Sequence, residues 1–151
     1  NNMANSVQAQ KIANVPSEKV KTNELTGRVR VAFAEYEASA EQSTIHMFSL
    51  PNGARIVSGR LAHDALGSST TLSVGHNEYL DSSESTVAAD VDEFKAAASS
   101  ASASSAAVAT TIALGENSVV NANKDGIPVS VTLAGANGTG TIQLHMTYVI
   151  D

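Results

Sequence analysis

The stretch GTGTIQLHMTYVID, residues 138–151, carries the clearest strand pattern in this chain. Every second position from Ile142 onward is apolar: Ile142, Leu144, Met146, Tyr148 and Ile150. Three of the intervening positions are polar: Gln143, His145 and Thr147. This alternation is typical of a β-strand with one buried face, because successive side chains point to opposite sides. The sequence therefore predicts a strand whose apolar set faces a hydrophobic core and whose polar set faces solvent or a partner.

A turn signal directly precedes this strand. Asn137 and Gly138 both tolerate a positive φ, which two-residue hairpin turns require. Another strand-like run, residues 129–133, lies just upstream. The sequence therefore predicts a hairpin of residues 129–133 with residues 139–150.

A second ribbon is predicted around LPNGARIVSGRL, residues 50–61. Residues 44–50 and 54–61 both read as strands, and Asn52-Gly53 between them is a strong turn signal. In the first run, Ile45 and Met47 share one parity while Phe48 and Leu50 share the other. This change of phase indicates a bulge or two covered faces.

The first strand of the body begins at about Arg28. Val29, Val31 and Phe33 alternate with Arg28, Arg30 and two alanines, which predicts that the Val and Phe side chains are buried. Further short strands are expected at residues 70–74, 107–114 and 118–122. Seven or eight short strands with regular turn signals favour an all-β fold, namely an antiparallel β-sandwich of jelly-roll type.

One segment has helical spacing. Val87, Val91 and Phe94 recur at intervals of four and three after a serine cluster, which predicts a short amphipathic helix with a serine cap. From Ala96 to Ala109 almost every residue is Ala or Ser, and we expect the helix to run on into a loop there. The β-sandwich domain is thus expected over residues 28–151, with a helical, Ala/Ser-rich insertion at about 82–106.

The apolar residues of segment 1–27 repeat neither with the period of a helix (3.6 residues) nor with that of a strand (2 residues). This segment is predicted to form an extended N-terminal arm. Because this segment is polar, it can bury little surface against its own domain. We therefore expect it to lie along a neighbouring chain. The alternative is an arm that straps across its own sheet. Basic residues are modestly concentrated here, and those expected to contact a partner are Lys11, Lys19, Lys21, Arg28 and Arg30.

Composition argues against several function classes. The chain has 151 residues, a net charge of −6 and a sequence pI of about 5.1. An acidic protein without a basic cluster is not expected to bind nucleic acid directly, because phosphate neutralisation supplies most non-specific affinity. The absence of cysteine removes disulfides and thiolate chemistry. No apolar run approaches the ~20 residues that a membrane-spanning helix needs.

No motif of catalysis or metal binding emerges. The four histidines, His46, His63, His76 and His145, lack the spacing of a metal site. His63-Asp64 has no nucleophile elbow to accompany it, and residues 81–92 lack the order of a calcium loop. Glu35 and Glu37 point the same way from a strand and are interpreted as a polar edge. We expect no catalytic residues, no metal ligands, no cofactor and no enzymatic activity.

Three phrases carry a resemblance to a known family. They are GRVRVAFAEYEAS (residues 27–39), TIHMFSLPNGARIVSGRLAHDALGSSTTLSVG (residues 44–75) and GTGTIQLHMTYVID (residues 138–151). This succession of strand, Leu-Pro-x-Gly-Ala turn, Thr-rich strand, Ala/Ser segment and final Tyr-Val strand resembles the capsid decoration, or cement, proteins of tailed bacteriophages. The layout spans about four-fifths of the chain, and its motifs are turns and strands rather than chemistry.

The resemblance implies a structural protein of the virion. Such proteins sit on the outer surface of the capsid head, where they bridge subunits of the major capsid protein, usually as homo-oligomers. A homotrimer is the expectation for this chain and a homodimer the alternative. The alternative function is a head-fibre or tail component that binds a host receptor or a glycan.

Overall fold

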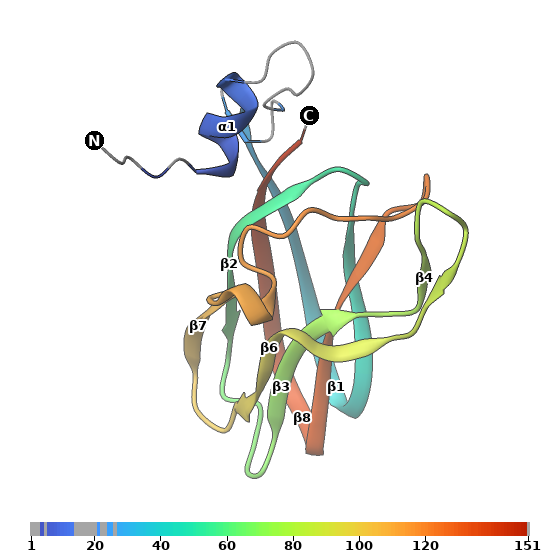
Figure 1. Ribbon diagram of the computed structural model, residues 1–151. Helices are drawn as coiled ribbons and strands as arrows, with labels where there is room; N and C mark the ends of the chain where they lie inside the picture. Colours follow the sequence, from blue (N-terminus) through green and yellow to red (C-terminus); the bar gives the residue numbers. More distant parts are fainter. Residues whose placement is uncertain (1–3, 5, 14–20, 22–23, 26, 151) are drawn as a thin grey trace.

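A long ribbon of two antiparallel strands runs through the whole fold (Figure 1). Its strands are β1 (Val29–Leu50) and β8 (Ile127–Val149). The other elements are β2 (Arg55–His63), β3 (Thr71–His76), β4 (Tyr79–Leu80), β5 (Thr86–Val87), β6 (Asp90–Ser99), β7 (Ser104–Val108), the 3-10 helix η1 (Ile112–Leu114) and the helix α1 (Val7–Ala13). The computed structural model describes residues 4, 6–13, 21, 24–25 and 27–150.

The ribbon belongs to two layers because both of its strands bend in the middle. In the first layer, residues 43–50 of β1 pair with the first part of β8, which pairs in turn with β3, and β3 pairs with β6. In the second layer, residues 29–38 of β1 pair with the last part of β8, followed by β2 and β7. The layers enclose one hydrophobic core, so the predicted all-β sandwich is confirmed.

The bend is held by a carboxylate. The pairing of β1 with β8 is irregular on both sides of Glu41. One oxygen of Glu41 accepts hydrogen bonds from the Tyr36 hydroxyl at 2.6 Å and from the Ser39 amide at 3.2 Å. These bonds, that of Tyr36 first, lower the pKa of Glu41, and the same contact raises the pKa of Tyr36. Hydrogen bonding to the ionised carboxylate thus closes the corner around which the ribbon folds.

The predicted hairpin of residues 129–133 with residues 139–150 is wrong. Both segments belong to the single strand β8, and Asn137-Gly138 lies at its bend. Gly135 and Gly140, which flank this dipeptide, have φ values of 85° and 141°. The chain turns a corner there without reversing, because β1 bends with it and continues to supply a hydrogen-bonding partner.

The ribbon predicted around Asn52-Gly53 is also wrong, although the turn itself exists. Gly53 has a φ of 88°, and the Ala54 amide donates to the Pro51 carbonyl at 3.2 Å. The turn carries the chain from the first layer to the second, so β2 pairs with β8 and β7 instead of returning along β1. The bulge predicted for residues 44–50 is confirmed by a register shift between His46 and Phe48.

The helix predicted around residues 82–94 is wrong as well. That segment contains the small β4–β5 pair and then β6, which pairs with β3. Phe94 is buried, but Val91 is 44% exposed, so the apolar residues do not share a face. Within the described residues, the α-helix is α1, in the segment predicted to be an arm without secondary structure. The strand predicted at residues 118–122 is reduced to one isolated bridge between Val119 and Arg55.

A wide bulge in β6 gathers three carboxylates. Val74 pairs with Lys95 and His76 pairs with Asp90, so the residues between Asp90 and Lys95 protrude opposite Gly75. The pKa of Asp92 is raised by its hydrogen bond with Asp90 and by the charge of that residue. The pKa of Glu93 is raised mainly by burial of its carboxyl group, and further by its hydrogen bond with Asp90 and by the charge of that residue. The folded state therefore holds these carboxyl groups close enough to share protons.

Replacing Asp92 by asparagine is expected to raise the melting temperature slightly at about pH 7. A raised carboxyl pKa means that the folded state binds protons more tightly than the unfolded state. Stability is therefore lost as pH rises through the raised pKa, and an amide avoids that loss. Differential scanning calorimetry should show the gain disappear at about pH 3, where Asp92 is protonated in both states. The control is Asp125→Asn on an exposed turn; a gain of the same size there would contradict the explanation.

Candidate functional site

The outer face of the second layer is an exposed sheet surface built by four strands. Its residues come from β1, β8, β2 and β7. The inward positions of β8 hold Ile142, Leu144 and Met146, all fully buried as the sequence predicts. The alternate positions of β8, including His145 and Thr147, therefore face outward. We call this surface the β1 face, because its most exposed apolar residues lie on that strand.

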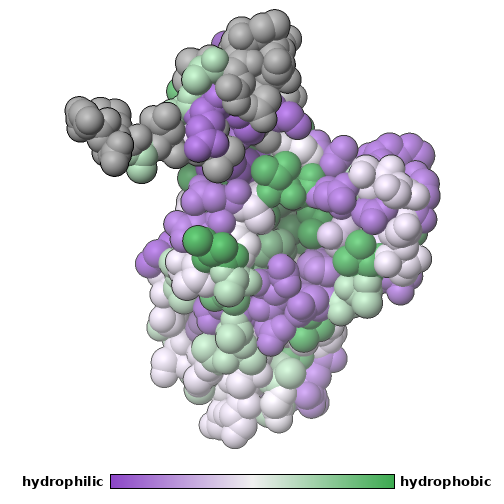
Figure 2. Space-filling model, in the orientation of Figure 1, coloured by the Kyte–Doolittle hydropathy of each residue, from purple (hydrophilic) through white to green (hydrophobic). Residues whose placement is uncertain are grey.

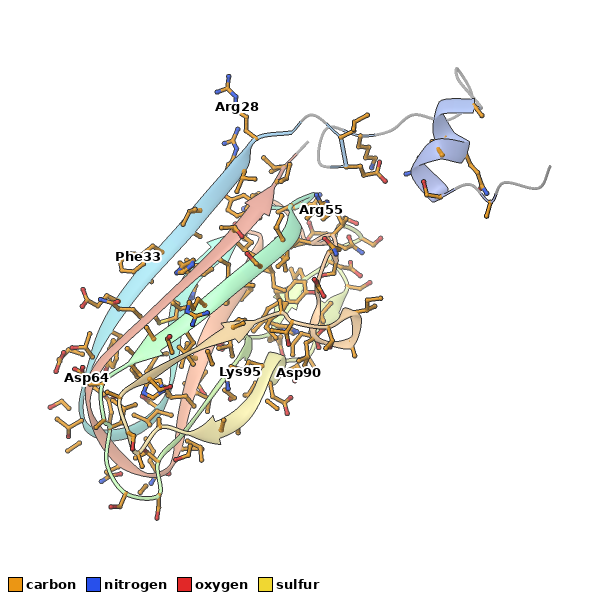
Figure 3. All side chains as sticks on the ribbon, turned by 90° about the vertical axis from the view of Figure 1, so that its left-hand side faces the viewer. Arg28, Phe33, Arg55, Asp64, Asp90 and Lys95 are labelled. Atoms are coloured by element: carbon orange, nitrogen blue, oxygen red, sulfur yellow. The ribbon has the colours of Figure 1, made fainter. Side chains whose placement is uncertain are left out.

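Three apolar side chains of β1 lie in the open. Val29, Val31 and Phe33 are 63%, 60% and 58% exposed, and Figure 3 shows Phe33 pointing away from the sandwich. The prediction that they are buried is wrong, because the opposite set of β1 residues packs inward. That set includes Ala32, Tyr36 and Ala38, which contact the core. Both sets are apolar, so the alternation alone did not tell which one faces inward.

Polar side chains continue the β1 face toward the bend. Glu35 accepts a hydrogen bond from Gln143 at 3.2 Å, and Glu37 accepts one from the Thr141 hydroxyl at 2.6 Å. The predicted interpretation of these two glutamates as a polar edge agrees with these contacts. Elsewhere on the face, the hydroxyls of Ser58 and Thr147 are hydrogen-bonded at 2.6 Å. Cross-strand pairs of this kind stabilise the sheet.

A depression of about 180 Å³ near the bend brings together a serine, a histidine and an aspartate. Its lining includes His63, Asp64 and Ser104. The Nδ1 atom of His63 is hydrogen-bonded to the backbone oxygen of Asp64 at 2.8 Å, and the Asp64 carboxylate accepts from the Thr141 amide at 3.2 Å. In the part of the chain that the structure describes, no hydrogen bond joins Ser104 to His63. The set therefore lacks the base-to-nucleophile contact that activates a serine.

Among the described residues, the predicted basic contact residues lie on two segments, the N-terminal arm and the start of β1. Lys11, on α1, forms an ion pair with Glu24 at 2.8 Å, so part of its charge is neutralised within the arm. Lys21 is exposed, and its backbone amide also donates to Glu24. Lys19 lies outside the described residues. Arg28 and Arg30 are exposed at the start of β1. Figure 3 shows Arg28 just before the first residue of this strand.

Helix α1 lies beyond one end of the sandwich (Figure 1), and Figure 3 shows it set apart from the start of β1. The described arm residues contact one another, as in the ion pair of Lys11 with Glu24. Neither predicted location, along a neighbouring chain or across its own sheet, is tested by these contacts. The expectation of a partner chain stays a prediction.

Other surfaces offer little chemistry. Over the lower ends of β6 and β7 the face shown in Figure 2 is mostly pale, as expected for the Ala and Ser residues of this region. No group of three or more His, Asp or Glu residues is placed to hold a metal ion within the described ranges. Among the helices that the structure describes, none is long and apolar enough to cross a membrane.

Comparisons with solved structures identify chains of the same fold. A chain of the capsid asymmetric unit of cyanophage Pam1 matches with a TM-score of 0.60 and 21% sequence identity, over 83% of this chain and 86% of that one. A chain of the capsid of Ralstonia phage GP4 matches with a TM-score of 0.61 and 20% identity, over 83% and 86%. A chain of the acid-stable capsid of Helicobacter pylori bacteriophage KHP30 matches with a TM-score of 0.53 and 18% identity, over 81% and 87%.

These likenesses extend over most of each chain, so they show that the sandwich as a whole is shared. No protein-family model matches the sequence, and none of the curated proteins matches it either.

Proposed function

We propose that this chain is a structural protein of a phage head, which binds the outer surface of the assembled capsid and bridges subunits of the major capsid protein. The observation that carries the proposal is the shared fold: three phage capsid structures contain chains that align with at least 81% of this one. The family resemblance of the turn and strand phrases points the same way. The proposed role is one of binding and not of catalysis.

Charge supports the outer surface of the head. A net charge of −6 disfavours a location against packaged DNA, since a protein facing phosphates is expected to be basic. On the exterior the same charge carries no such penalty. We therefore propose that the chain contacts protein and not nucleic acid.

A cement protein can act by mass action alone. A partner that binds the assembled shell but not its separated subunits stabilises the shell by RT ln(1 + [L]/Kd). Repetition over a lattice multiplies modest contacts at each site. The exposed β1 face and the N-terminal arm suit such a role, because neither requires a deep pocket.

The arm is proposed to make part of the contact with the shell. A segment outside the sandwich can add contact surface, but it loses about 1–2 kcal/mol of backbone conformational entropy for each residue that becomes ordered on binding. Its basic residues, with Arg28 and Arg30 at the start of β1, provide charges that suit acidic patches on a partner. The proposed contact residues are Lys11, Lys19, Lys21, Arg28 and Arg30.

Deletion of residues 1–22 is expected to weaken binding to shells about tenfold or more, because the arm and its basic side chains are removed together. The assay is co-sedimentation of the purified chain with undecorated shells assembled from the cognate major capsid protein. The control is Lys124→Glu, since the Lys124 side chain is 87% exposed and forms an ion pair with the neighbouring Asp125.

Two results would count against these proposals. Undiminished occupancy by the truncated chain would remove the arm from the contact. Absence of binding by the full-length chain would overturn the proposed function. Adsorption of the chain to host cells or to a glycan array without shell binding would favour the head-fibre or tail alternative.

A further inference from the structure

The first half of β1 is a free sheet edge. Residues 29–38 pair with β8 on one side, and among the described residues no strand pairs with their other side. Figure 3 shows this half of β1 along the border of the sandwich. Such an edge presents unpaired N–H and C=O groups that can hydrogen-bond to another strand. A partner can therefore add a strand here, which is a common mode of peptide recognition.

Residues 31–38 lack the features that usually prevent such pairing. Natural edges are protected by Lys, Pro, bulges or inward-pointing charges. This segment contains no Lys and no Pro, and the bulges of β1 begin only after Ala38. Its inward positions hold Tyr36 and three alanines. The charges of inward parity, Arg28 and Arg30, occur only at the start of the edge.

The outward side chains of this edge divide into an apolar half and an acidic half. Val29, Val31 and Phe33 are each more than half exposed. Glu35 and Glu37 follow with the same outward parity and are also exposed. Within the described ranges neither glutamate forms an ion pair, and both accept hydrogen bonds from uncharged side chains of β8. A complementary strand would present apolar side chains to the first half and cations to the second.

A second copy of β1 does not supply this complement. In a parallel pair in register, the glutamates of the two copies would lie side by side, which is destabilising. In an antiparallel pair that matches the apolar residues about Val31, Glu35 falls opposite Gly27. Arg28 and Arg30 have the inward parity, so they project from the other face of the strand. The charges therefore favour a different chain as the occupant of this edge.

We propose that an extended segment of the major capsid protein pairs with the first half of β1 in antiparallel orientation and adds one strand to the second layer. This assigns the contact surface of the proposed function and rests on that function. On the outward face, the segment carries apolar side chains opposite Val29, Val31 and Phe33. It carries Lys or Arg opposite Glu35 and Glu37.

The antiparallel orientation follows from the sheet. The strand pairs that the structure describes, β1 with β8 included, are antiparallel. An antiparallel addition continues this pattern, and antiparallel pairing is slightly more stable per residue than parallel pairing. In this orientation the C-terminal end of the segment lies beside Arg28 and Arg30, where acidic side chains complete the match.

A designed peptide tests the pairing without any shell. The probe is Lys-Thr-Lys-Thr-Val-Thr-Val-Glu-Val-Glu, which in antiparallel register sets its lysines opposite Glu37 and Glu35 and its glutamates opposite Arg30 and Arg28. The reversed peptide has the same composition, but in the same pairing it sets Glu against Glu and Lys against Arg. Fluorescence anisotropy of the labelled peptides should show about tenfold or more tighter binding of the first peptide. Equal affinities, or binding of neither peptide, would overturn the proposed pairing.

A charge reversal tests the register. Glu35→Lys should weaken binding of the first peptide about tenfold or more, because it replaces an attraction across the new strand pair by a repulsion. The matched control is Glu84→Lys, since Glu84 is exposed and lies between β4 and β5. Equal losses in the two variants would overturn the assigned register.

Shell binding tests the same edge in the proposed function. Phe33→Asp should weaken co-sedimentation with undecorated shells about tenfold or more, because it places a charge in the apolar half of the contact. The matched control is Ile112→Asp, since Ile112 is 88% exposed and lies on η1. Equal melting temperatures would show that both variants fold.

The two proposals fail separately. Shell binding that Phe33→Asp leaves unchanged would overturn the role of this edge alone. A chain that binds the first peptide but no shell would overturn the capsid function and leave the strand-accepting edge in place. Sedimentation velocity of the free chain covers the remaining occupant: an oligomer that Phe33→Asp dissociates would assign the edge to a second copy and overturn the proposal.

Discussion

Replacing Gly75 by alanine is expected to lower the free energy of unfolding by more than about 3 kcal/mol. A Cβ atom at this position would lie 1.9 Å from the Asp90 backbone oxygen and 2.5 Å from the Val91 carbonyl carbon. Both are backbone atoms of the bulge in β6, so no side-chain rotation relieves the overlap. The variant must separate β3 from β6, which form one end of the first layer.

Thermal unfolding followed by circular dichroism measures this effect. For a chain of this length, 3 kcal/mol corresponds to a fall of roughly 6–12 °C in the melting temperature. Gly138→Ala is the matched control, because its Cβ would meet only the side chains of Leu133 and Leu66, at 3.1 Å or more. Equal losses in the two variants would contradict the close approach of β6 to β3.

Replacing Leu144 by alanine is expected to cost about 3 kcal/mol, since truncation of a fully buried leucine removes packing and leaves a cavity. Leu144 is 0% exposed and lies in the central strand of the second layer, opposite Ala34 of β1 and Leu61 of β2. The core around it cannot easily collapse, because two neighbouring strands fix the backbone on either side.

Gln143→Ala is the control for this variant, because the two residues are adjacent on β8 but face opposite sides. Gln143 is exposed and makes one hydrogen bond, to Glu35. Its replacement should change stability by less than about 1 kcal/mol. Chemical denaturation of both variants tests the register directly, since a slip of one residue would exchange their positions. A larger loss from Gln143→Ala than from Leu144→Ala would therefore contradict the pairing of β8.

Local patterns were sufficient where a residue's environment depends on its own strand. The inward set of residues 142–146, the bulge near Phe48 and the turn at Gly53 were all predicted correctly. In each case the signal is a short-range one, either alternation in a fully apolar set or tolerance of a positive φ. The fold class followed from the number of such signals.

Local patterns failed where a partner strand decided the outcome. Asn137-Gly138 looks like a hairpin turn, but β1 bends alongside it, and the strand continues around the corner. Residues 82–94 have helical spacing, yet β3 offers β6 an edge to pair with, and Phe94 is the residue that reaches the core. Hydrogen bonding to a strand distant in the sequence outweighed a weak local preference.

The candidate binding surface was missed for the same reason. Val31 and Phe33 seemed suited to a buried face, but the alanines and Tyr36 on the opposite side of β1 fill the space beside β8. By itself the sequence determined an acidic, cysteine-free β-sandwich and the inward face of residues 142–146, because a strict apolar alternation there permits only one buried side. Only the tertiary structure decided that β1 is an edge whose larger apolar residues face outward, because the identity of its neighbours is not encoded within the strand.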